Sequence, residues 1–328
     1  MYIPADRAAW RARLDGPEPD VWRWHQVVKL HRTGTQGIPA LPAGAKGIAL
    51  MGFASDEGVV RNLGRVGAVE GPQMLRQFCA GLPVHFDAEQ NVMLDLGTVV
   101  CQNQNLEEAQ EELGALNAAA LAAGYRTLIL GGGHEVTYAH WLGTRTRLSP
   151  GQTAGIINFD AHYDLRDLDP ELGRHSGNSF TAMAADCAAE GRPFAYAALG
   201  IQRTGNTRRL FNRAAELGAV TIFGEEMGGG VLAAATERLG RFIADHQPSM
   251  LTIDMDVFSA SLAPGVSAPN AIGILPGPAF MSLLRQTLHA PCLRSVDVAE
   301  LNPRYDLDNR TARLGAALCF ETVQAWVG

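Results

Sequence analysis

The sequence has few cysteines, and none of them are close neighbours. Its 328 residues include five cysteines, all widely spaced and without a Cys-x-x-Cys pair. This spacing argues against a disulfide framework and against a zinc site built from thiolates. We therefore expect buried free thiols at these positions: Cys79, Cys101, Cys187, Cys292 and Cys319.

The chain also lacks an excess of basic residues and a long apolar run. Lys and Arg total 27 against 34 Asp and Glu, a net charge of −7, which argues against a broad nucleic-acid surface. No apolar run approaches the roughly 20 residues of a membrane-spanning helix. The first ten residues do not have the pattern of a secretory signal. We expect a cytoplasmic protein that binds neither nucleic acid nor membrane.

Short apolar runs alternate with stretches of helical composition. Residues 106–123 and 233–246 are typical of surface helices, and the alternation predicts a mostly parallel sheet with helices on both faces. We predict one domain over residues 1–328, a three-layer α/β/α sandwich with about eight strands, in which 1–45 form a less regular extension. The strands are predicted at 47–53, 93–100, 126–130, 154–159, 195–201, 219–223, 250–255 and 294–298.

Metal-ligand side chains follow three of these predicted strands. Asp160, His162 and Asp164 alternate after one apolar run, and an extended backbone would aim all three the same way. Asp254 and Asp256 follow a second run, and a third leads through three glycines into His134. In parallel α/β sheets, sites form at the carboxyl ends of strands.

Six such residues together favour a pair of divalent cations. Four carboxylates would balance two ions, and without metal they would repel one another in a partly buried pocket. Each residue alone has an ordinary alternative, since an Asp after a strand is commonly a helix N-cap and a His near a Gly turn is commonly just hydrogen-bonded. Ligation without thiolate favours Mn²⁺ over Zn²⁺, with Fe²⁺, Co²⁺ and Ni²⁺ as possible substitutes. Two such ions can deprotonate a bridging water near neutral pH.

Three motifs carry a family resemblance. Gly-Gly-Gly-His at 131–134, Asp-Ala-His-Tyr-Asp at 160–164 and Thr-Ile-Asp-Met-Asp at 252–256 with Ala-Pro-Gly at 263–265 resemble the metal-binding signatures of the arginase and agmatinase family of ureohydrolases. The resemblance extends from about residue 62 to 309. It implies an arginase-like fold and two Mn²⁺ ions per subunit, one held by His134, Asp160, Asp164 and Asp254 and the other by His162, Asp160, Asp254 and Asp256.

Finer details resemble the branch of this family that hydrolyses N-formimino-L-glutamate to L-glutamate and formamide in histidine degradation. They include Gly-Gly-Gly-His-Glu at 131–135, Asp-Leu-Arg at 164–166, Ser-Gly-Asn-Ser-Phe at 176–180, Ala-Pro-Gly-Val-Ser-Ala-Pro at 263–269 and Asn-Arg-Thr-Ala-Arg at 309–313. Arg-Trp-His-Gln at 23–26 also fits. The substrate would be a small molecule with carboxylates, and family habit suggests a homo-oligomer.

Two departures from arginase bear on the substrate. Phe180 stands where arginase has its proton-shuttling His and cannot transfer a proton; His175 nearby is more simply a surface residue of a loop. Arg166 stands where arginases present an uncharged Asn, and its guanidinium can bind a substrate carboxylate through paired hydrogen bonds. The alternative for Arg166 is a weak surface salt bridge to Asp167 or Asp169.

Further residues are candidates for binding the substrate. A second carboxylate could be bound by an arginine at 61, 65, 310 or 313, each of which could equally be a solvated surface charge. We select Arg65 and Arg310 from these four. The resemblance adds Asn178 from the Ser-Gly-Asn segment.

Glu300 and Asp164 are the expected catalytic residues. By the resemblance, Glu300 contacts the planar nitrogen group of the substrate, although it could instead be a turn carboxylate before Asn302 and Pro303. A metal-bridging hydroxide would attack the amidine carbon, and Asp164 would pass its proton to the leaving amine of glutamate.

Two other functions remain open from the sequence. The substrate could be guanidinobutyrate, agmatine, arginine or another guanidino compound, although Arg166 disfavours a cationic tail. A catalytically inactive metal-binding protein is the non-enzyme alternative, and the presence of all six ligands with Glu300 weakens it. In enzyme terms the expectation is a hydrolase of carbon–nitrogen bonds in linear amidines.

Overall fold

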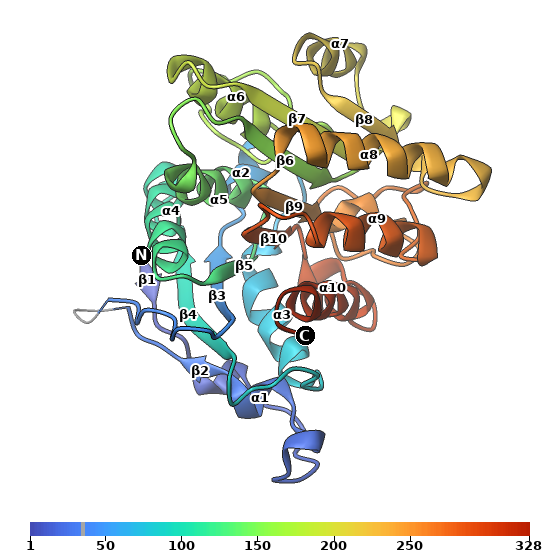
Figure 1. The fold of residues 1–328 in the computed structure, drawn as a ribbon. Helices are drawn as coiled ribbons and strands as arrows, with labels where there is room; N and C mark the ends of the chain where they lie inside the picture. Colours follow the sequence, from blue (N-terminus) through green and yellow to red (C-terminus); the bar gives the residue numbers. More distant parts are fainter. Residues whose placement is uncertain (34–36) are drawn as a thin grey trace.

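A central β-sheet takes strands from nearly the whole length of the chain (Figure 1). The structure is a computed structural model and describes residues 1–33 and 37–328. The ten strands of these residues follow the order β1-β4-β3-β5-β10-β9-β6-β7-β8, with β2 paired to β4. Their bounds are β1 Tyr2–Ile3, β2 Lys29–Leu30, β3 Gly47–Ala54, β4 Val92–Val100, β5 Arg126–Leu130, β6 Ala154–Phe159, β7 Phe194–Ile201, β8 Val220–Phe223, β9 Met250–Asp254 and β10 Ser295–Ala299.

The predicted fold class is confirmed, and each of the eight predicted strands is present. All pairings are parallel except that of β1 with β4. β5, β6, β9 and β10 are buried almost throughout, which explains why they appear in the sequence as continuous apolar runs. The two additional strands, β1 and β2, have two residues each and are too short to carry a periodic signal.

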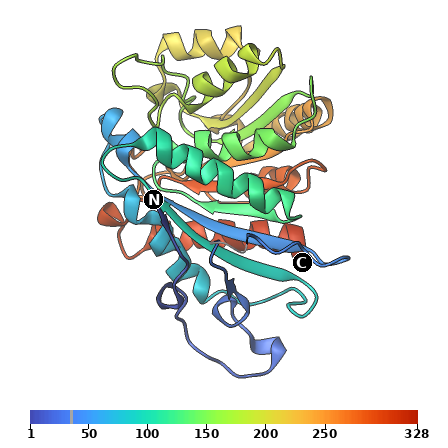
Figure 2. The same cartoon turned by 90° about the vertical axis from the view of Figure 1, so that its left-hand side faces the viewer.

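Helices cover both faces of the sheet (Figures 1 and 2). α4 to α7 pack on one face, where their side chains join two apolar clusters. α1, α3, α8, α9 and α10 pack on the other face around the largest cluster. The bounds are α1 Trp24–Val27, α2 Glu57–Arg61, α3 Gly71–Ala80, α4 Leu106–Ala122, α5 Val136–Thr144, α6 Ser179–Ala189, α7 Arg208–Glu216, α8 Leu232–His246, α9 Pro278–Leu288 and α10 Arg310–Val327.

The two helices predicted from composition begin and end close to the expected residues. α4 begins after Asn105, whose side chain accepts a hydrogen bond from the backbone N–H of Glu108, an N-cap that satisfies one donor of the first turn. α8 ends at His246, and the next residue, Gln247, has left-handed φ and ψ, which is a common way to end a helix.

The N-terminal segment is fastened to the sheet at Trp10 by a buried polar contact. The indole N–H of Trp10 donates to Asp95 Oδ2 at 2.7 Å, and Arg76 forms a paired contact with the same carboxylate at 2.8 and 3.0 Å. Breaking such a buried ion pair would leave an uncompensated charge. That the chain is one domain with a less regular extension at 1–45 stays a prediction.

The five cysteines are free thiols, as predicted. Cys79, Cys187 and Cys319 are buried, whereas Cys101 and Cys292 are partly exposed, so the expectation of burial is wrong for these two. In the described part of the chain, no helix is both long and apolar enough to cross a membrane.

The strand order places the predicted ligands at one edge of the sheet. β5, β10, β9 and β6 are consecutive neighbours and run parallel. Their carboxyl ends therefore lie side by side: Asp254 is the last residue of β9, and the segments that follow the other three strands carry His134, Glu300 and Asp160.

Candidate metal centre

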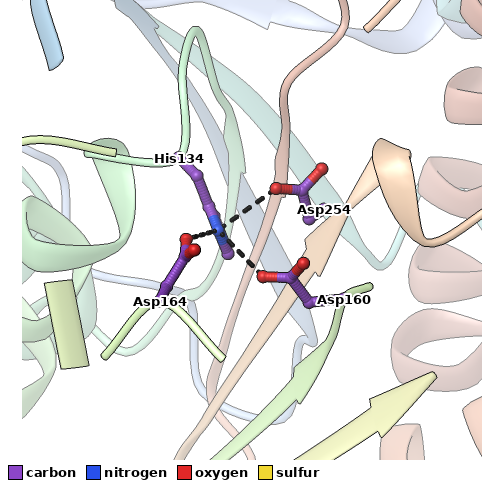
Figure 3. Close-up of side chains that lie close together, drawn as sticks. All are labelled: His134, Asp160, Asp164 and Asp254. Carbon is purple, nitrogen blue, oxygen red and sulfur yellow. Dashed lines mark hydrogen bonds and ion pairs between the residues drawn. The ribbon is translucent and has the colours of Figure 1, made fainter. Parts of the chain in front are cut away.

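Four ligand side chains converge on one point (Figure 3). His134 Nδ1 lies 2.7 Å from Asp164 Oδ2, 3.2 Å from Asp254 Oδ2 and 3.3 Å from Asp160 Oδ2. His134, Asp160 and Asp254 are at most 3% exposed. One cation at this point would have an imidazole nitrogen and three carboxylates as ligands.

A second group adjoins the first through a shared residue. Asp160, His162 and Asp256 also bring one ligand atom each within coordinating distance of one another, with His162 Nδ1 3.0 Å from Asp256 Oδ2 and 3.5 Å from Asp160 Oδ1. All six predicted ligands therefore meet, and Asp160 belongs to both groups. Among the described residues, Asp254 belongs to the first group only, so its predicted bridging role stays a prediction.

The predicted ligands are brought together, but the extended backbone predicted for residues 160–164 is wrong. β6 ends at Phe159, so residues 160–164 are not an extended strand, and Asp164 has a left-handed φ of 48°. Asp160 Oδ1 instead accepts the backbone N–H of His162 at 2.6 Å. This hydrogen bond between the Asp160 side chain and the backbone stabilises a turn, as Asp side chains commonly do.

Asp254 repeats this arrangement at the end of β9. Its Oδ1 accepts the backbone N–H of Asp256 at 2.7 Å, and Asp256 lies in the 3-10 helix η8, Met255–Val257. At both strand ends, Oδ1 fixes the turn while Oδ2 faces His134, and Oδ1 of Asp160 also lies 3.5 Å from His162 Nδ1. These contacts preorganise the ligands.

The glycines before His134 allow a close backbone approach. A Cβ on Gly132 would lie 2.0 Å from the carbonyl oxygen of Ser55. Only glycine fits there. The backbone N–H of Gly133 donates to the same carbonyl at 2.9 Å, which fixes the loop that presents His134.

The carboxylates do not ionise equally in this cluster. Burial, followed by repulsion from Asp160, raises the pKa of Asp164 to about 6, and burial, with a contribution from Asp160, raises the pKa of Asp256 to about 6. Burial and the charges of Asp256 and Asp160 hold the pKa of Asp254 well above its usual range. Burial also opposes ionisation of Asp160, but hydrogen bonds to His134 and His162 outweigh it and lower that pKa.

The pKa values of the two imidazoles, His134 and His162, are raised, which favours their protonated forms. Burial alone would lower the pKa of His134, but the charge of Asp254 and the other carboxylates raise it well above the usual value. His162 shows the same balance, with Asp256 as its main partner. The buried acids thus attract protons, and divalent cations would supply the same positive charge.

The donor set fits two divalent cations. It contains four carboxylates and two imidazoles and no thiolate, which suits Mn²⁺ and related ions. Asp256 Oδ1 is buried and has no hydrogen-bond partner among the described residues, and a buried carboxylate oxygen without a partner is costly. A bound cation would remove that cost.

Glu300 faces the cluster rather than the following turn. It follows β10 with a left-handed φ of 70°, and its Oε1 accepts the backbone N–H of His134 at 2.7 Å. Its Oε2 is buried without a hydrogen-bond partner among the described residues. Burial is the main cause of a raised pKa for this carboxyl. The turn-carboxylate alternative is therefore wrong.

A pocket of about 250 Å³ opens beside the cluster. Its lining includes Glu300 and Arg166 together with the ligands His134, His162, Asp164, Asp254 and Asp256. Arg166 is exposed and forms no salt bridge among the described residues, because Asp167 pairs with Arg209 and Arg213. The salt-bridge alternative for Arg166 is wrong, and its guanidinium is available at the pocket.

The other predicted substrate residues are placed differently. Arg65 lines the pocket but donates to the carbonyls of Pro264 and Val266 at 3.2 and 2.5 Å. Asn178 is buried and accepts the backbone N–H of His175 at 2.9 Å, outside the pocket lining. Arg310 is exposed on the first turn of α10 and is also outside that lining.

The remaining candidates have structural partners. Arg61 forms ion pairs with Glu57 and Glu107, and the guanidinium of Arg313 lies 5.2 Å from the centroid of the Phe78 ring. The surface-charge alternative is therefore wrong for Arg61, whereas Arg313 is exposed and fits it.

Phe180 and His175 are both buried. Phe180 packs edge-on against the ring of His134, with centroids 6.0 Å apart. His175 is 6% exposed, so the expectation of a surface residue is wrong. Its Nδ1 accepts the backbone N–H of Gly177 at 3.1 Å, and burial, followed by the charge of Arg166, lowers its pKa to about 4. A neutral ring held by a loop backbone is a poor proton shuttle.

Sequence reasoning missed several polar residues of the pocket. Asn62, Ser176 and Ser267 line it, and Asn62 Nδ2 donates to Ser176 Oγ at 3.0 Å. All three lie inside motifs that carry the resemblance or at its edge. Isolated Ser and Asn residues in loops have too many ordinary roles to be selected without the fold.

The chain matches known proteins over nearly its whole length. The model of the Arginase family matches residues 46–324. A formimidoylglutamase of Geobacillus thermodenitrificans is 39% identical over 324 residues, covering 98% of this chain and 97% of the relative. A formimidoylglutamase of Nocardia farcinica is 42% identical over 322 residues, covering 98% and 96%.

Solved structures agree with these matches. Trypanosoma cruzi formiminoglutamase with Mn²⁺ superposes with a TM-score of 0.74 at 26% identity, covering 86% of this chain and 94% of that chain. The formimidoylglutamase of Bacillus subtilis superposes with a TM-score of 0.78 at 20% identity, covering 96% and 95%, which supports the fold.

Proposed function

The chain belongs to the arginase family, and from that premise we propose that it has formimidoylglutamase activity. It would hydrolyse the amidine carbon–nitrogen bond of N-formimino-L-glutamate and release L-glutamate and formamide in histidine degradation. The observation that carries this proposal is that six ligand side chains meet and that five of them line one pocket together with Glu300 and Arg166. Relatives about 40% identical along the chain, named formimidoylglutamase, support it.

We propose that two Mn²⁺ ions occupy the centre. His134, Asp160, Asp164 and Asp254 would hold one ion, and Asp160, His162, Asp254 and Asp256 the other. When bound, such ions lower the pKa of water and thereby supply a nucleophile near neutral pH. The oxygen-rich donor set and the Mn²⁺ in the Trypanosoma cruzi structure support this choice of metal.

Arg166 would bind a substrate carboxylate at the pocket mouth. Its planar guanidinium has no ion-pair partner among the described residues, so it can form two charge-assisted hydrogen bonds with a carboxylate. Arg65 offers less to a ligand, because two of its hydrogen bonds go to carbonyls and its guanidinium stacks on Tyr305, 4.0 Å from the ring centroid. Both of those hydrogen bonds are donated by Nη2, so a second carboxylate would be bound by Nη1, and the buried Nε also lacks a partner among the described residues. Arg310 and Asn178 lie outside the pocket lining, so we propose no direct contact between them and the substrate.

Glu300 would orient the amidine of the substrate. Its Oε1 is fixed by the backbone N–H of His134, and its Oε2 is the free acceptor at the pocket. An amidinium nitrogen would satisfy that oxygen and bring the carbon toward the cluster. Because this carboxylate is already fixed in place, little reorganisation of the site is needed when the substrate binds.

Asp164 would move the proton that the reaction requires. The leaving amine of glutamate must be protonated, and Phe180 cannot serve as a donor. Asp164 lines the pocket, so its carboxylate can take a proton from the attacking water and deliver it to the amine.

Activity against a substrate panel tests the proposal. The Mn²⁺-loaded protein is assayed for glutamate release from N-formimino-L-glutamate and for urea release from arginine, agmatine and guanidinobutyrate. We expect turnover of the formimino substrate alone. Urea from a guanidino compound would support the alternative that the enzyme acts on a guanidino substrate. No turnover at all would support an inactive metal-binding protein. The cytoplasmic location and the homo-oligomer stay predictions.

A further inference from the structure

A row of buried polar side chains continues from the metal cluster into the protein. His134 Nε2 lies 2.9 Å from Thr252 Oγ1, the Thr252 hydroxyl donates to Asp297 Oδ1 at 2.7 Å, and Asp297 Oδ2 lies 2.6 Å from His140 Nδ1. The residues come from the loop after β5, from β9, from β10 and from α5. None is more than 1% exposed. The proposed reaction gives this row no role.

The direction of these hydrogen bonds determines where His134 carries its proton. A hydroxyl has one proton, and that of Thr252 goes to the carboxylate of Asp297. Thr252 Oγ1 can then only accept from His134, so Nε2 of His134 must be the protonated nitrogen. Thr137 Oγ1, 3.2 Å from Thr252 Oγ1, would donate to the second lone pair of the same oxygen.

This tautomer suits metal binding. With the proton on Nε2, a neutral His134 has its lone pair on Nδ1, the atom that faces Asp160, Asp164 and Asp254. The opposite tautomer would direct an N–H at the cation. Partners behind a ligating histidine commonly set its tautomer and orientation in this way.

His140 completes the row. Its Nδ1 is the only ring nitrogen with a hydrogen-bond partner among the described residues, because Nε2 is buried without one. A buried N–H without an acceptor is costly, so the proton of a neutral ring belongs on Nδ1 and is donated to Asp297. Both oxygens of Asp297 then accept, and its carboxylate is held toward Thr252.

We infer that Thr252, Asp297 and His140 are positioning residues that hold His134 in the tautomer with Nε2 protonated, so that Nδ1 is directed to the cation. The inference rests on the metal site of the proposed function but not on its substrate. Each member acts through its neighbour. Loss of the row would weaken one of the two cation sites and leave the site of His162 and Asp256 unchanged.

Mn²⁺ binding to chelator-stripped protein, measured by calorimetric titration at fixed pH, tests this inference. Thr252→Val removes the hydroxyl and keeps the branched shape. We expect it to weaken one of two sites about 10- to 100-fold, the usual effect of losing such a partner. Thr252→Ser restores a hydroxyl and should bind both ions within about threefold of the parent.

Thr127→Val is the matched control. Thr127 also lies fully buried on a parallel strand, and its hydroxyl donates to Asn117 Oδ1 at 2.8 Å, away from the cluster. The variant loses a comparable hydrogen bond, so it should lose comparable stability and keep both affinities. An equal loss of Mn²⁺ affinity in Thr127→Val would mean that destabilisation explains the effect and would overturn the inference.

Asp297→Leu is a second variant in case Thr252→Val does not fold. Leucine accepts no hydrogen bond, so the Thr252 hydroxyl can turn toward Nε2 of His134 and no longer holds the proton of His134 on that nitrogen. This change should weaken the same site. Unchanged affinity at both sites, or a parent that binds no Mn²⁺, would refute the inference. Site-selective loss in a protein that hydrolyses no formimino substrate would support the inference while the proposed function fails.

Discussion

The buried acids of the cluster make the metal-free protein sensitive to pH between about 4 and 7. Asp164 and Asp256 have pKa values raised from 3.8 to about 6. A carboxyl whose pKa is raised by folding contributes stability that is present below the unfolded value and lost as the pH rises through the folded value. We therefore expect metal-free protein to lose stability as the pH rises from about 4 past about 6.

The other shifts of the cluster do not reverse this sign. The raised pKa values of His134 and His162 contribute stability that is also lost as the pH rises through their folded values. The lowered pKa of Asp160 acts in the opposite sense, but its contribution is lost only as the pH falls below the usual range of an aspartate.

The size of the effect follows from the raised pKa values of Asp164 and Asp256. A rise from 3.8 to about 6 corresponds to about 3 kcal/mol for either carboxyl. Because Asp164 and Asp256 share one cluster, their effects do not add in full. We take about 3 kcal/mol for the pair, or a change in Tm of about 4 °C for a chain of this length.

Thermal unfolding with and without Mn²⁺ measures this dependence. The Tm of chelator-treated protein should fall between about pH 4 and 7, and the gain in Tm from added Mn²⁺ should grow over the same range, because the ion replaces protons. Asp164→Asn cannot ionise and should show a flatter metal-free profile, whereas the exposed Asp308→Asn should follow the parent. A parent profile that is flat, or that coincides with that of Asp164→Asn, would refute the reasoning.

Three further predictions concern activity. Arg166→Met should lower kcat/KM for N-formimino-L-glutamate about 10- to 100-fold, because a charge-assisted contact is lost. The control Arg310→Met lies outside the pocket lining and should change kcat/KM less than about twofold. Steady-state kinetics of both variants test this, and equal losses would contradict the role of Arg166. Asp164→Asn should lower turnover by about 100-fold or more, and an enzyme with both Mn²⁺ ions bound and full turnover would contradict it. Glu300→Gln should raise KM and lower kcat, together about 10- to 1,000-fold in kcat/KM, while Mn²⁺ binding by calorimetry stays within about threefold; unchanged kinetics would exclude amidine binding by Glu300.

The sheet was predictable because burial on both faces leaves a direct trace in the sequence. A parallel strand between helical layers is apolar at nearly every position, as β6 and β9 show. β1 and β2 leave no such trace, since each has two residues at the margin of the sheet. Their pairing depends on contacts with β4, some 65 to 100 residues away in sequence.

The site was predictable in its ligands but not in its supporting contacts. Arg65 is a good candidate for an anion by residue type, yet its partners are carbonyls about 200 residues further along the chain. Thr252, Asp297 and His140 lie inside segments where Thr, Asp and His have many ordinary roles. Only the fold shows that these side chains are buried in one row.

The backbone conformation at two site residues explains why their placement could not be predicted from local sequence, although the residues themselves were predicted. Asp164 and Glu300 both have positive φ, 48° and 70°, a region that disfavours residues with a Cβ and favours glycine. Local propensity would therefore not place either carboxylate where it lies. Such strain persists only where surrounding contacts determine the conformation, and here Glu300 is fixed by the backbone N–H of His134 and by its own N–H, which donates to Gly132 at 2.7 Å. A glycine at either position would relieve the strain but would remove the carboxylate. The retention of Asp164 and Glu300 in this unfavourable conformation is what we expect if the pocket requires their charge.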